Sequence, residues 1–308
     1  MIQTNEIGEI WDKFDVLLGP DKQVQVITVG SILGAWSFPV LFDYDIPVDI
    51  KLWKEVVWNI EFIGIQMLLS VADQGPTNQA LDRDLKVSPE NVEVVNPFDP
   101  TRTTLMGHDS VHFVKNFRSF FLDKAKVRFS GNIEFSKNDL KQLMIKCKNL
   151  GICKLRDIHF TCNKSDRQNV RLATELWSET NALLLKDFFP DDVAKQHLSE
   201  FINVLDKSFN IFTSTGGDNS DFSKAEFDMY FDKQKEILEQ LDWYLSNLKD
   251  IGNYQFPKAG KMMIKCILKL YDILSSYGVK SFKTSPLTTD DLEGGILINS
   301  VLKIFWFA

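Results

Sequence analysis

The chain of 308 residues is 44% hydrophobic and 12% aromatic, which suffices for one large or two ordinary domains with packed cores. Its net charge of −7 argues against a compact basic nucleic-acid-binding protein, although a local basic groove can exist on an acidic body. No apolar run approaches the roughly 20 residues of a membrane span, and the first residues lack the features of a signal peptide. The four cysteines form no CxxC pair, which predicts reduced intracellular thiols and no zinc site.

The first 125 residues alternate between strand and helix patterns. Two β-rich runs around a short connection predict a hairpin. The spacing then becomes helical, with apolar residues every three or four positions from Leu52 to Ile63. A polar turn precedes the last helix of this part, for which Asp109 or Ser110 is the expected N-cap. The expected elements are strands Gln23–Ile32 and Phe38–Asp43, a helix from Val48, a strand ending at Asp73, helix Thr77–Leu85, strand Val92–Val95 and helix His108–Leu122.

The segment Leu68–Asn78 contains the first candidate site residue. Its apolar run ends on a single carboxylate, Asp73, and breaks at once at Gly75 and Pro76. Because this turn cannot continue a buried strand, Asp73 is expected at the carboxyl end of a central strand. Catalytic groups gather at that edge of an open α/β sheet, and a carboxylate there can bind a divalent metal ion. Asp73 can also cap the following helix, and the segment alone leaves both roles open.

After about Lys124 the pattern changes to a series of amphipathic helices. Apolar residues recur at helical spacing, and Thr215–Ser220 predicts a flexible loop between two of the helices. Gly278 is a suitable αL residue to end the last one. Such helices serve more often as scaffold than as binding site. The expected helices are Ser136–Lys148, Asp166–Phe188, Asp191–Phe209, Phe222–Leu248 and Gly260–Tyr277.

A second group of acids lies in Leu287–Glu293, after a break at Pro286. Its threonines can cap a helix whose first turn carries Asp290 and Glu293, and the helix dipole stabilises acids there. The two acids are three residues apart and therefore share one helix face. A strand-end Asp with a helix-borne Glu is also what two-metal phosphoryl transfer requires, because carboxylates hold both ions. The cap and metal roles both remain open.

Six short blocks of the sequence occur in the order of one known family. They are Leu18–Pro20 with Gln25-Val26, Trp36–Pro39 with Phe42–Asp45, Ala72–Asn78, Asp109–Lys115 with Arg118, Gln168–Ser178 and Leu287–Glu293. These blocks resemble motifs of the P-element-type transposases, the group that includes the THAP-domain transposase-like proteins. The third block resembles the strand end with the second catalytic Asp, the fifth the opening of a GTP-binding insertion, and the sixth the motif with the last catalytic acid. The resemblance covers nearly the whole chain.

The resemblance implies an RNase H-like α/β core with a mixed sheet, interrupted by a mostly helical GTP-binding insertion. The implied core consists of residues 1–124 and 286–308, and the insertion of residues 125–285. Asp73 and Glu293 would then be catalytic acids and Mg²⁺ ligands, with Asp290 near the metal ion of the nucleotide. The aromatic ring of Phe209 would pack on the guanine. The implied nucleotide contacts are Lys154, Val170, Ser178, Phe209, Asn210 and Thr213.

The expected guanine contacts depart from the family pattern F-D-x-x-N. Asn210 stands where the family has the acid, and Thr213 stands where it has the asparagine. A neutral carbonyl accepts weaker hydrogen bonds than a carboxylate does, because charge-assisted bonds are roughly twice as strong. The sequence therefore predicts weak or doubtful GTP binding with little selectivity.

Both ends of the chain also depart from the family. The family's first catalytic Asp belongs to a strand just before the segment matching Ile2–Gly19, whereas this sequence begins at Met1. Two glycines after Glu293 weaken the helix that would present it. The tail Ile296–Ala308 is expected as an exposed apolar run. These features predict a truncated copy.

The function expected from the resemblance is that of a P-element-like DNA transposase fragment, truncated and inactive or domesticated. In the family, cut-and-paste transposition and DNA integration depend on Mg²⁺ and are linked to GTP. Expected partners are transposon-end DNA and a second copy or related transposases, with no membrane and with a nuclear location. Two alternatives remain open: an active transposase, and a helical nucleotide- or protein-binding scaffold without nuclease activity whose acids are only caps.

Overall fold

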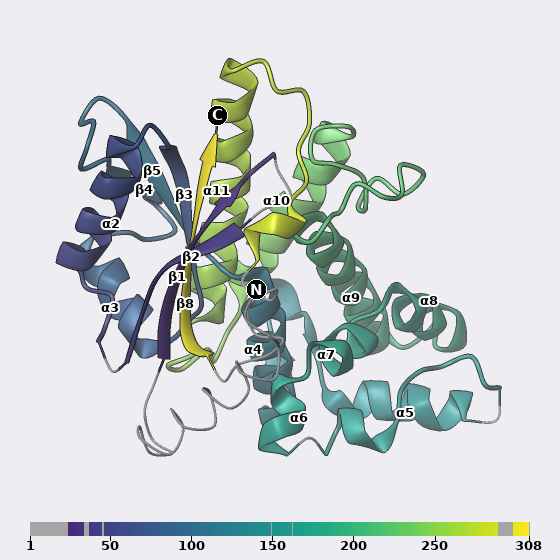
Figure 1. The fold of residues 1–308 in the computed structure, drawn as a ribbon. Helices are drawn as coiled ribbons and strands as arrows, with labels where there is room; N and C mark the ends of the chain where they lie inside the picture. Colours follow the sequence, from purple (N-terminus) through teal and green to yellow (C-terminus); the bar gives the residue numbers. More distant parts are fainter. Residues whose placement is uncertain are drawn as a thin grey trace, which may run out of the picture.

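The computed structural model describes residues 24–33, 37–44, 46–148, 150–161, 163–288 and 298–307. The described chain contains a six-stranded mixed sheet with helices on both faces and a larger helical body beside it (Figure 1). The strands are β1 (Val24–Ser31), β2 (Ser37–Tyr44), β3 (Gln66–Ala72), β4 (Glu93–Val95), β5 (Thr103–His108), β8 (Ile298–Phe307) and the separate pair β6 (Val127–Arg128) and β7 (Glu134–Phe135). The helices are α2 (Ile50–Phe62), α3 (Pro76–Asp84), α4 (Ser110–Asp123), α5 (Lys137–Cys147), α6 (Lys164–Gln168), α7 (Val170–Leu176), α8 (Glu179–Phe188), α9 (Val193–Phe212), α10 (Phe231–Asn247) and α11 (Phe256–Ser276).

The strand order of the large sheet is β2-β1-β8-β3-β5-β4. The expected hairpin is confirmed, since β1 and β2 pair antiparallel. Pro39 lies in β2, where its missing N–H is tolerated because β2 is an edge strand. β3 pairs parallel with β5, and short β4 forms the other edge. The mixed α/β core expected from the sequence is therefore present.

The tail of the chain forms the central strand β8 and is not the exposed run that the sequence predicted. β8 runs parallel to β1 and antiparallel to β3, with Leu302 opposite Ala72. Its sequence INSVLKIFWF is rich in the β-branched and aromatic residues that favour strands. An apolar run bonded on both sides suits the middle of a sheet better than its surface.

Strand β5 was also missed, because the sequence predicted a polar turn in front of a helix beginning at His108. Its Gly107 weakens the strand pattern but has a packing reason. A Cβ atom at this position would lie 3.3 Å from the Sγ atom of Cys266 in α11, so the glycine permits close contact between strand and helix. The Cys266 thiol also donates to the Met106 carbonyl at 3.2 Å.

Helices cover the two faces of the sheet. The Trp53 Nε1–H of α2 donates to the Ser70 hydroxyl of β3 at 3.2 Å. On the opposite face α11 packs against β5 and α4 (Figure 1). The expected stop of α11 is confirmed, since Gly278 has a φ of 82°. Thus α11, which falls within the expected insertion of residues 125–285, contacts the sheet directly.

The helical body differs from the expected helices at two places. The long helix Asp166–Phe188 is divided into α6, α7 and α8, because Asn169 and Ser178 act as new N-caps. Arg118 of α4 is fully buried and donates to the carbonyl oxygens of Asp166, Arg167 and Asn169, which fixes the first break.

The second difference concerns the start of α10, which begins at Phe231 instead of Phe222. The bounds of α9 (Val193–Phe212) and α11 (Phe256–Ser276) also differ by a few residues from the expected ones, whereas the predicted caps are found. Asp109 caps α4, and Ser136 begins α5 through a capping box with Asp139. Within the described residues, no helix is long and apolar enough to span a membrane.

Candidate active site

Asp73 lies directly after β3 and is 6% exposed. Its Oδ1 atom accepts hydrogen bonds from the Gly75 backbone N–H at 2.7 Å and from the Asn78 Nδ2 at 2.8 Å. These bonds stabilise the turn into α3, whose own N-cap, Gly75, has no side chain to offer. The Oδ2 atom has no hydrogen bond or ion pair within the described part of the chain. One oxygen therefore supports the turn, and the other is available to a cation.

The ends of β3 and β5 lie side by side at this edge of the sheet. Ala72 is opposite His108, and the Asp109 N–H donates to the Ala72 carbonyl at 3.0 Å. Asp109 is fully buried, and its carboxylate accepts from the Val111 N–H at 2.7 Å as the N-cap of α4. The strand-end position predicted for Asp73 is thus confirmed, and Asp109 is the expected cap.

The other two predicted acids, Asp290 and Glu293, lie outside the described residues. The described chain returns to the sheet at Ile298, and the antiparallel register of β8 places its first residues at the edge where β3 ends. No group of three or more His, Cys, Asp or Glu side chains that could hold a metal ion occurs among the residues that the structure describes.

The residues expected to contact a nucleotide fall mainly around the start of α8 and the end of α9. Ser178 is the N-cap of α8, and its hydroxyl donates to the Glu175 carbonyl at 3.2 Å. Half-buried Phe209 and Asn210 lie in the last turn of α9, and Thr213 is its C-cap. The Thr213 hydroxyl donates to the Phe209 carbonyl at 2.8 Å.

Asp206 is a member of this group that the sequence analysis missed. Its Oδ2 atom accepts from the Asn210 Nδ2 at 3.2 Å, and its carboxyl also accepts from the Glu179 backbone N–H. Burial and the nearby Glu179 carboxylate raise the pKa of Asp206 to about 6. The signal in the sequence was its position four residues before Asn210, which places both on one helix face. Asp206 thus joins the start of α8 to the end of α9.

Lys154 and Val170 lie at the margin of this cluster. Lys154 is exposed, next to Cys153, whose Sγ atom lies 3.8 Å from the Asn181 Oδ1 in the first turn of α8. Val170 begins α7, whereas Ser178 follows its end. The seven residues of α7 span about 10 Å at 1.5 Å per residue, a distance that an extended nucleotide can bridge.

Comparisons with known proteins identify relatives of the chain. No protein-family model matches the sequence. The transposable element P transposase of Drosophila melanogaster is 22% identical over 292 residues, which cover 91% of this chain and 38% of that protein. The solved Drosophila P element transposase strand transfer complex matches with a TM-score of 0.79 and 20% identity, covering 87% of this chain and 70% of that chain. By both comparisons the chain is similar to P-element-type transposases.

The relationship confirms the family resemblance and the α/β fold. Because the match covers 87% of this chain, the P-element-type likeness includes both the sheet and most of the helical body. The chain spans less than half the length of the P transposase that it matches. The roles of the individual site residues remain predictions.

Proposed function

We propose that the chain is a P-element-transposase-like protein that binds transposon-end DNA through an RNase H-like core and has little or no DNA-cleaving activity. The fold match to a transposase strand transfer complex carries this proposal. The position of Asp73 supports it, because a buried strand-end carboxylate with one available oxygen suits an oxygen-binding divalent ion. The relationship does not favour a purely helical scaffold, since the similarity includes the sheet.

Mg²⁺ is the metal ion that this site would bind. Asp73 fits as one hard oxygen ligand, and Glu293 remains the proposed second ligand. Glu293 precedes Ile298 by five residues, so the chain geometry limits its distance from the sheet edge to about 17 Å. Bound Mg²⁺ would stabilise the charge on phosphate oxygens. The role of Asp73 itself would be to orient the ion at the end of β3.

The composition of strand β8, which lies beside β3 and Asp73, is the reason we expect little DNA-cleaving activity. β8 lies between β1 and β3, and its sequence contains no Asp or Glu. Strand β8 therefore supplies no second carboxylate to the edge where β3 ends, and the Asp109 carboxylate after β5 serves there as the N-cap of α4. A site with fewer charged ligands binds Mg²⁺ more weakly, because water replaces a carboxylate at lower affinity.

The cluster around Ser178, Phe209 and Asn210 is the proposed nucleotide site, with GTP as its ligand. Asp206 supports this proposal, since it holds the Asn210 amide group by its Nδ2 atom. The Asn210 Oδ1 atom then remains to accept from the donors of guanine. Association with a second copy or with related transposases in the nucleus completes the proposed role.

Metal binding and DNA cleavage test the proposal on the purified chain. Asp73→Asn removes the charge but retains an oxygen for the turn, and Asp84→Asn at the exposed end of α3 is the matched control. We expect weak Mg²⁺ binding by calorimetry that is lost in Asp73→Asn and unchanged in Asp84→Asn. A labelled DNA duplex should bind in EDTA and should remain uncut in Mg²⁺.

Two results would contradict the proposal in different ways. Mg²⁺-dependent cutting that requires Asp73 would show an active enzyme. Failure of the chain to bind any DNA duplex would refute the DNA-binding role itself.

A further inference from the structure

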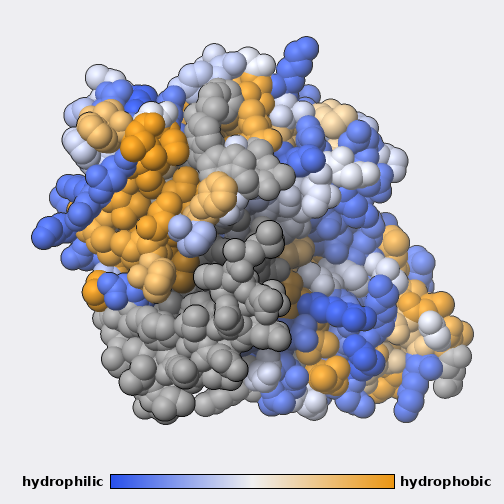
Figure 2. All heavy atoms as spheres, viewed as in Figure 1, coloured by the Kyte–Doolittle hydropathy of each residue, from blue (hydrophilic) through white to orange (hydrophobic). Residues whose placement is uncertain are grey.

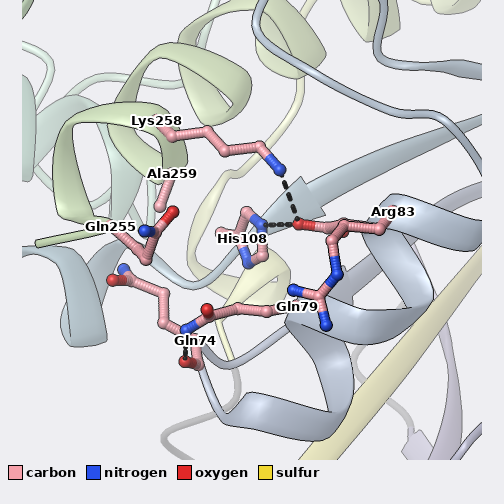
Figure 3. Close-up of a pocket in the computed structure, with 8 residues that line it drawn as sticks. Gln74, Gln79, Arg83, His108, Gln255, Lys258 and Ala259 are labelled. Carbon is pink, nitrogen blue, oxygen red and sulfur yellow. Dashed lines mark hydrogen bonds and ion pairs between the residues drawn. The ribbon is translucent and has the colours of Figure 1, made fainter. Parts of the chain in front are cut away.

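A cavity of about 220 Å³ lies beside Asp73 at the same edge of the sheet. Side chains of the β3–α3 segment form one wall, and the first turn of α11 forms the other, with His108 between them (Figure 3). The polar lining residues on which the inference depends are Gln74, Gln79, Asp82, Arg83, His108 and Lys258.

Two lining side chains have buried nitrogen atoms without a partner. His108 is 3% exposed, and its Nε2 atom lies 2.9 Å from the Asp82 Oδ2. Its Nδ1 atom has no hydrogen-bond partner among the described residues. The Gln74 Oε1 atom accepts from the Asn116 Nδ2 at 2.9 Å, which orients the amide, yet the Gln74 Nε2 is buried without an acceptor. Leaving such a buried donor unsatisfied costs about 1–3 kcal/mol, so a ligand that accepts from it is favoured.

The charges around the cavity favour an anion. Asp82 is 4% exposed and is already contacted by His108 and by the Lys258 Nζ at 3.3 Å. Arg83 is exposed at the rim and has no carboxylate partner in the described parts of the chain. With one buried acid against two cations, the lining carries a net positive charge when His108 is neutral.

The start of α11 adds to this positive potential. Its N-cap, Gln255, makes no side-chain cap hydrogen bond. Pro257 has no N–H, so the N–H groups of the first turn without an intrahelical acceptor are those of Phe256 and Lys258, and the dipole of this 21-residue helix places a partial positive charge at the same end. Both features suit a bound phosphate.

We propose that this cavity binds a phosphate group of a nucleic-acid strand that passes the sheet edge beside Asp73. Gln74, Arg83 and Lys258 are lining residues whose N–H groups could donate to such a phosphate. Among the described residues, the lining contains no Phe, Tyr or Trp on which a base could stack, so the observations favour the phosphate over the base. The assignment of the phosphate to a DNA strand rests on the proposed function, whereas phosphate binding itself does not.

The surface of α11 supports a strand as the source. Lys261 and Lys265 follow Lys258 at three- and four-residue spacing, and therefore on nearly the same face of the helix. Both are half-buried, and no carboxylate lies within ion-pair distance of either among the described residues. Successive phosphates of one strand could contact these lysines beyond the cavity.

Arg83 offers the sharpest test, because it is exposed and its replacement should leave the fold intact. Arg83→Ala is compared with Arg83→Lys, which retains the charge, and with Lys186→Ala on the exposed side of α8 as a charge-matched control. All measurements are made in EDTA, so that failure of the Mg²⁺ site does not affect them. Binding of inorganic phosphate is measured as the change in thermal melting temperature relative to chloride at equal ionic strength. Binding of a labelled single-stranded oligonucleotide is measured by fluorescence anisotropy.

We expect phosphate to raise the melting temperature of the wild type and of Lys186→Ala but not of Arg83→Ala. Oligonucleotide affinity should fall about tenfold in Arg83→Ala, as for loss of one charged hydrogen bond. The slope of log K against log salt should become shallower by about 0.7, the value for one phosphate of a single strand. Equal behaviour of Arg83→Ala and Lys186→Ala with both probes would overturn the site. Dependence on Arg83 for phosphate but not for the oligonucleotide would overturn the assignment to a strand.

Discussion

Asp206 is a half-buried carboxyl group through which pH should act on stability. Burial and the Glu179 charge raise its pKa from 3.8 to about 6 in the folded protein, whereas the unfolded chain ionises near pH 4. Between these values the folded state binds more protons than the unfolded state. The free energy of unfolding therefore falls as the pH rises from about 4 to about 6. Above pH 6 the free energy of unfolding is lower than at pH 4 by an amount on the order of 3 kcal/mol.

Replacing Asp206 by Asn should remove this loss. The amide oxygen can still accept from the Glu179 N–H, and no charge needs to be buried. We expect Asp206→Asn to raise the free energy of unfolding by about 1–3 kcal/mol at pH 7 and to change it little at pH 4. Urea unfolding at both pH values measures the difference, with exposed Asp84→Asn as the control. A gain of equal size at pH 4 and pH 7 would exclude ionisation of Asp206 as its cause.

The same residue changes what is expected of the nucleotide site. The sequence allowed the Asn210 amide to donate to adenine, but one of the two N–H groups of its Nδ2 atom already donates to Asp206, which leaves a single donor. We therefore expect weak nucleotide binding with a modest preference for GTP over ATP. Asp206→Ala frees the amide and should reduce this preference, whereas Asn210→Asp should increase it, because a carboxylate accepts more strongly from guanine. Calorimetric titration of both nucleotides decides the matter, and an unchanged GTP-to-ATP ratio in both variants would show that the guanine is recognised elsewhere.

At the scale of elements, local sequence patterns predicted the helices and strands that are determined by residues close together in the sequence. The hairpin, α2 and the end of β3 follow from alternation, helical spacing and the Gly75-Pro76 break. The missed elements depend on distant partners. β5 contains Gly107 because Cys266 lies against it, and the break before α7 is held by Arg118. Cys266 and Arg118 lie far away in the sequence from the elements that they affect. The local periodicity of a short sequence segment therefore cannot reveal these contacts.

Strand β8 is the element whose removal should affect the sheet most. Lys303 pairs with Thr28 on one side and Val71 on the other. Lys303→Pro removes a backbone N–H from the centre of the sheet, and we expect a loss of about 3 kcal/mol or more in the free energy of unfolding. Lys303→Gln also removes the charge but retains the N–H, and should cost less than Lys303→Pro. Urea unfolding compares the two; equal stability would mean that residues 298–307 do not form a central strand.

At the scale of the molecule, the sheet and the helical body share one core. A single cluster of buried residues includes Ile27 and Leu69 of the sheet together with Phe201 and Leu241 of the helices. The sequence predicted the change of pattern near Lys124 but not this continuity, since helix α11 returns to the sheet only in three dimensions. The position of Asp73 was predictable because a strand end is a local feature. The cavity beside it was not, because its walls come from segments 176 residues apart, as the Lys258–Asp82 ion pair shows.

Apolar side chains also gather on the surface over the part of the molecule that holds α2 (Figure 2). Trp58 and Phe62 of α2 stack with ring centroids 5.2 Å apart, and Phe98 packs against Trp58 at 5.5 Å. Phe62 is 67% exposed. This exposed ring provides a control for tests of the shared core, because its removal takes little buried area from the folded state.

Phe117 of α4 lies where the two parts of the core meet, and its loss should weaken both. Its ring is fully buried and contacts Trp177, Phe201 and Phe256 with centroid distances of 5.0–5.3 Å. We expect Phe117→Ala to lower the free energy of unfolding by about 3–5 kcal/mol, and Phe62→Ala to change it by less than 1 kcal/mol.

Hydrogen exchange followed by mass spectrometry can locate the effect of Phe117→Ala. If the core is continuous, amides of β3 and of α9 should lose protection together and by similar factors, because both open through the same global unfolding. The division into a core and an insertion of residues 125–285 predicts a different result. In that case α9 would retain its protection while β3 opened, or the reverse. Because α11 and Phe256 belong to the insertion by sequence yet pack on the sheet and on α4, we expect a single cooperative loss.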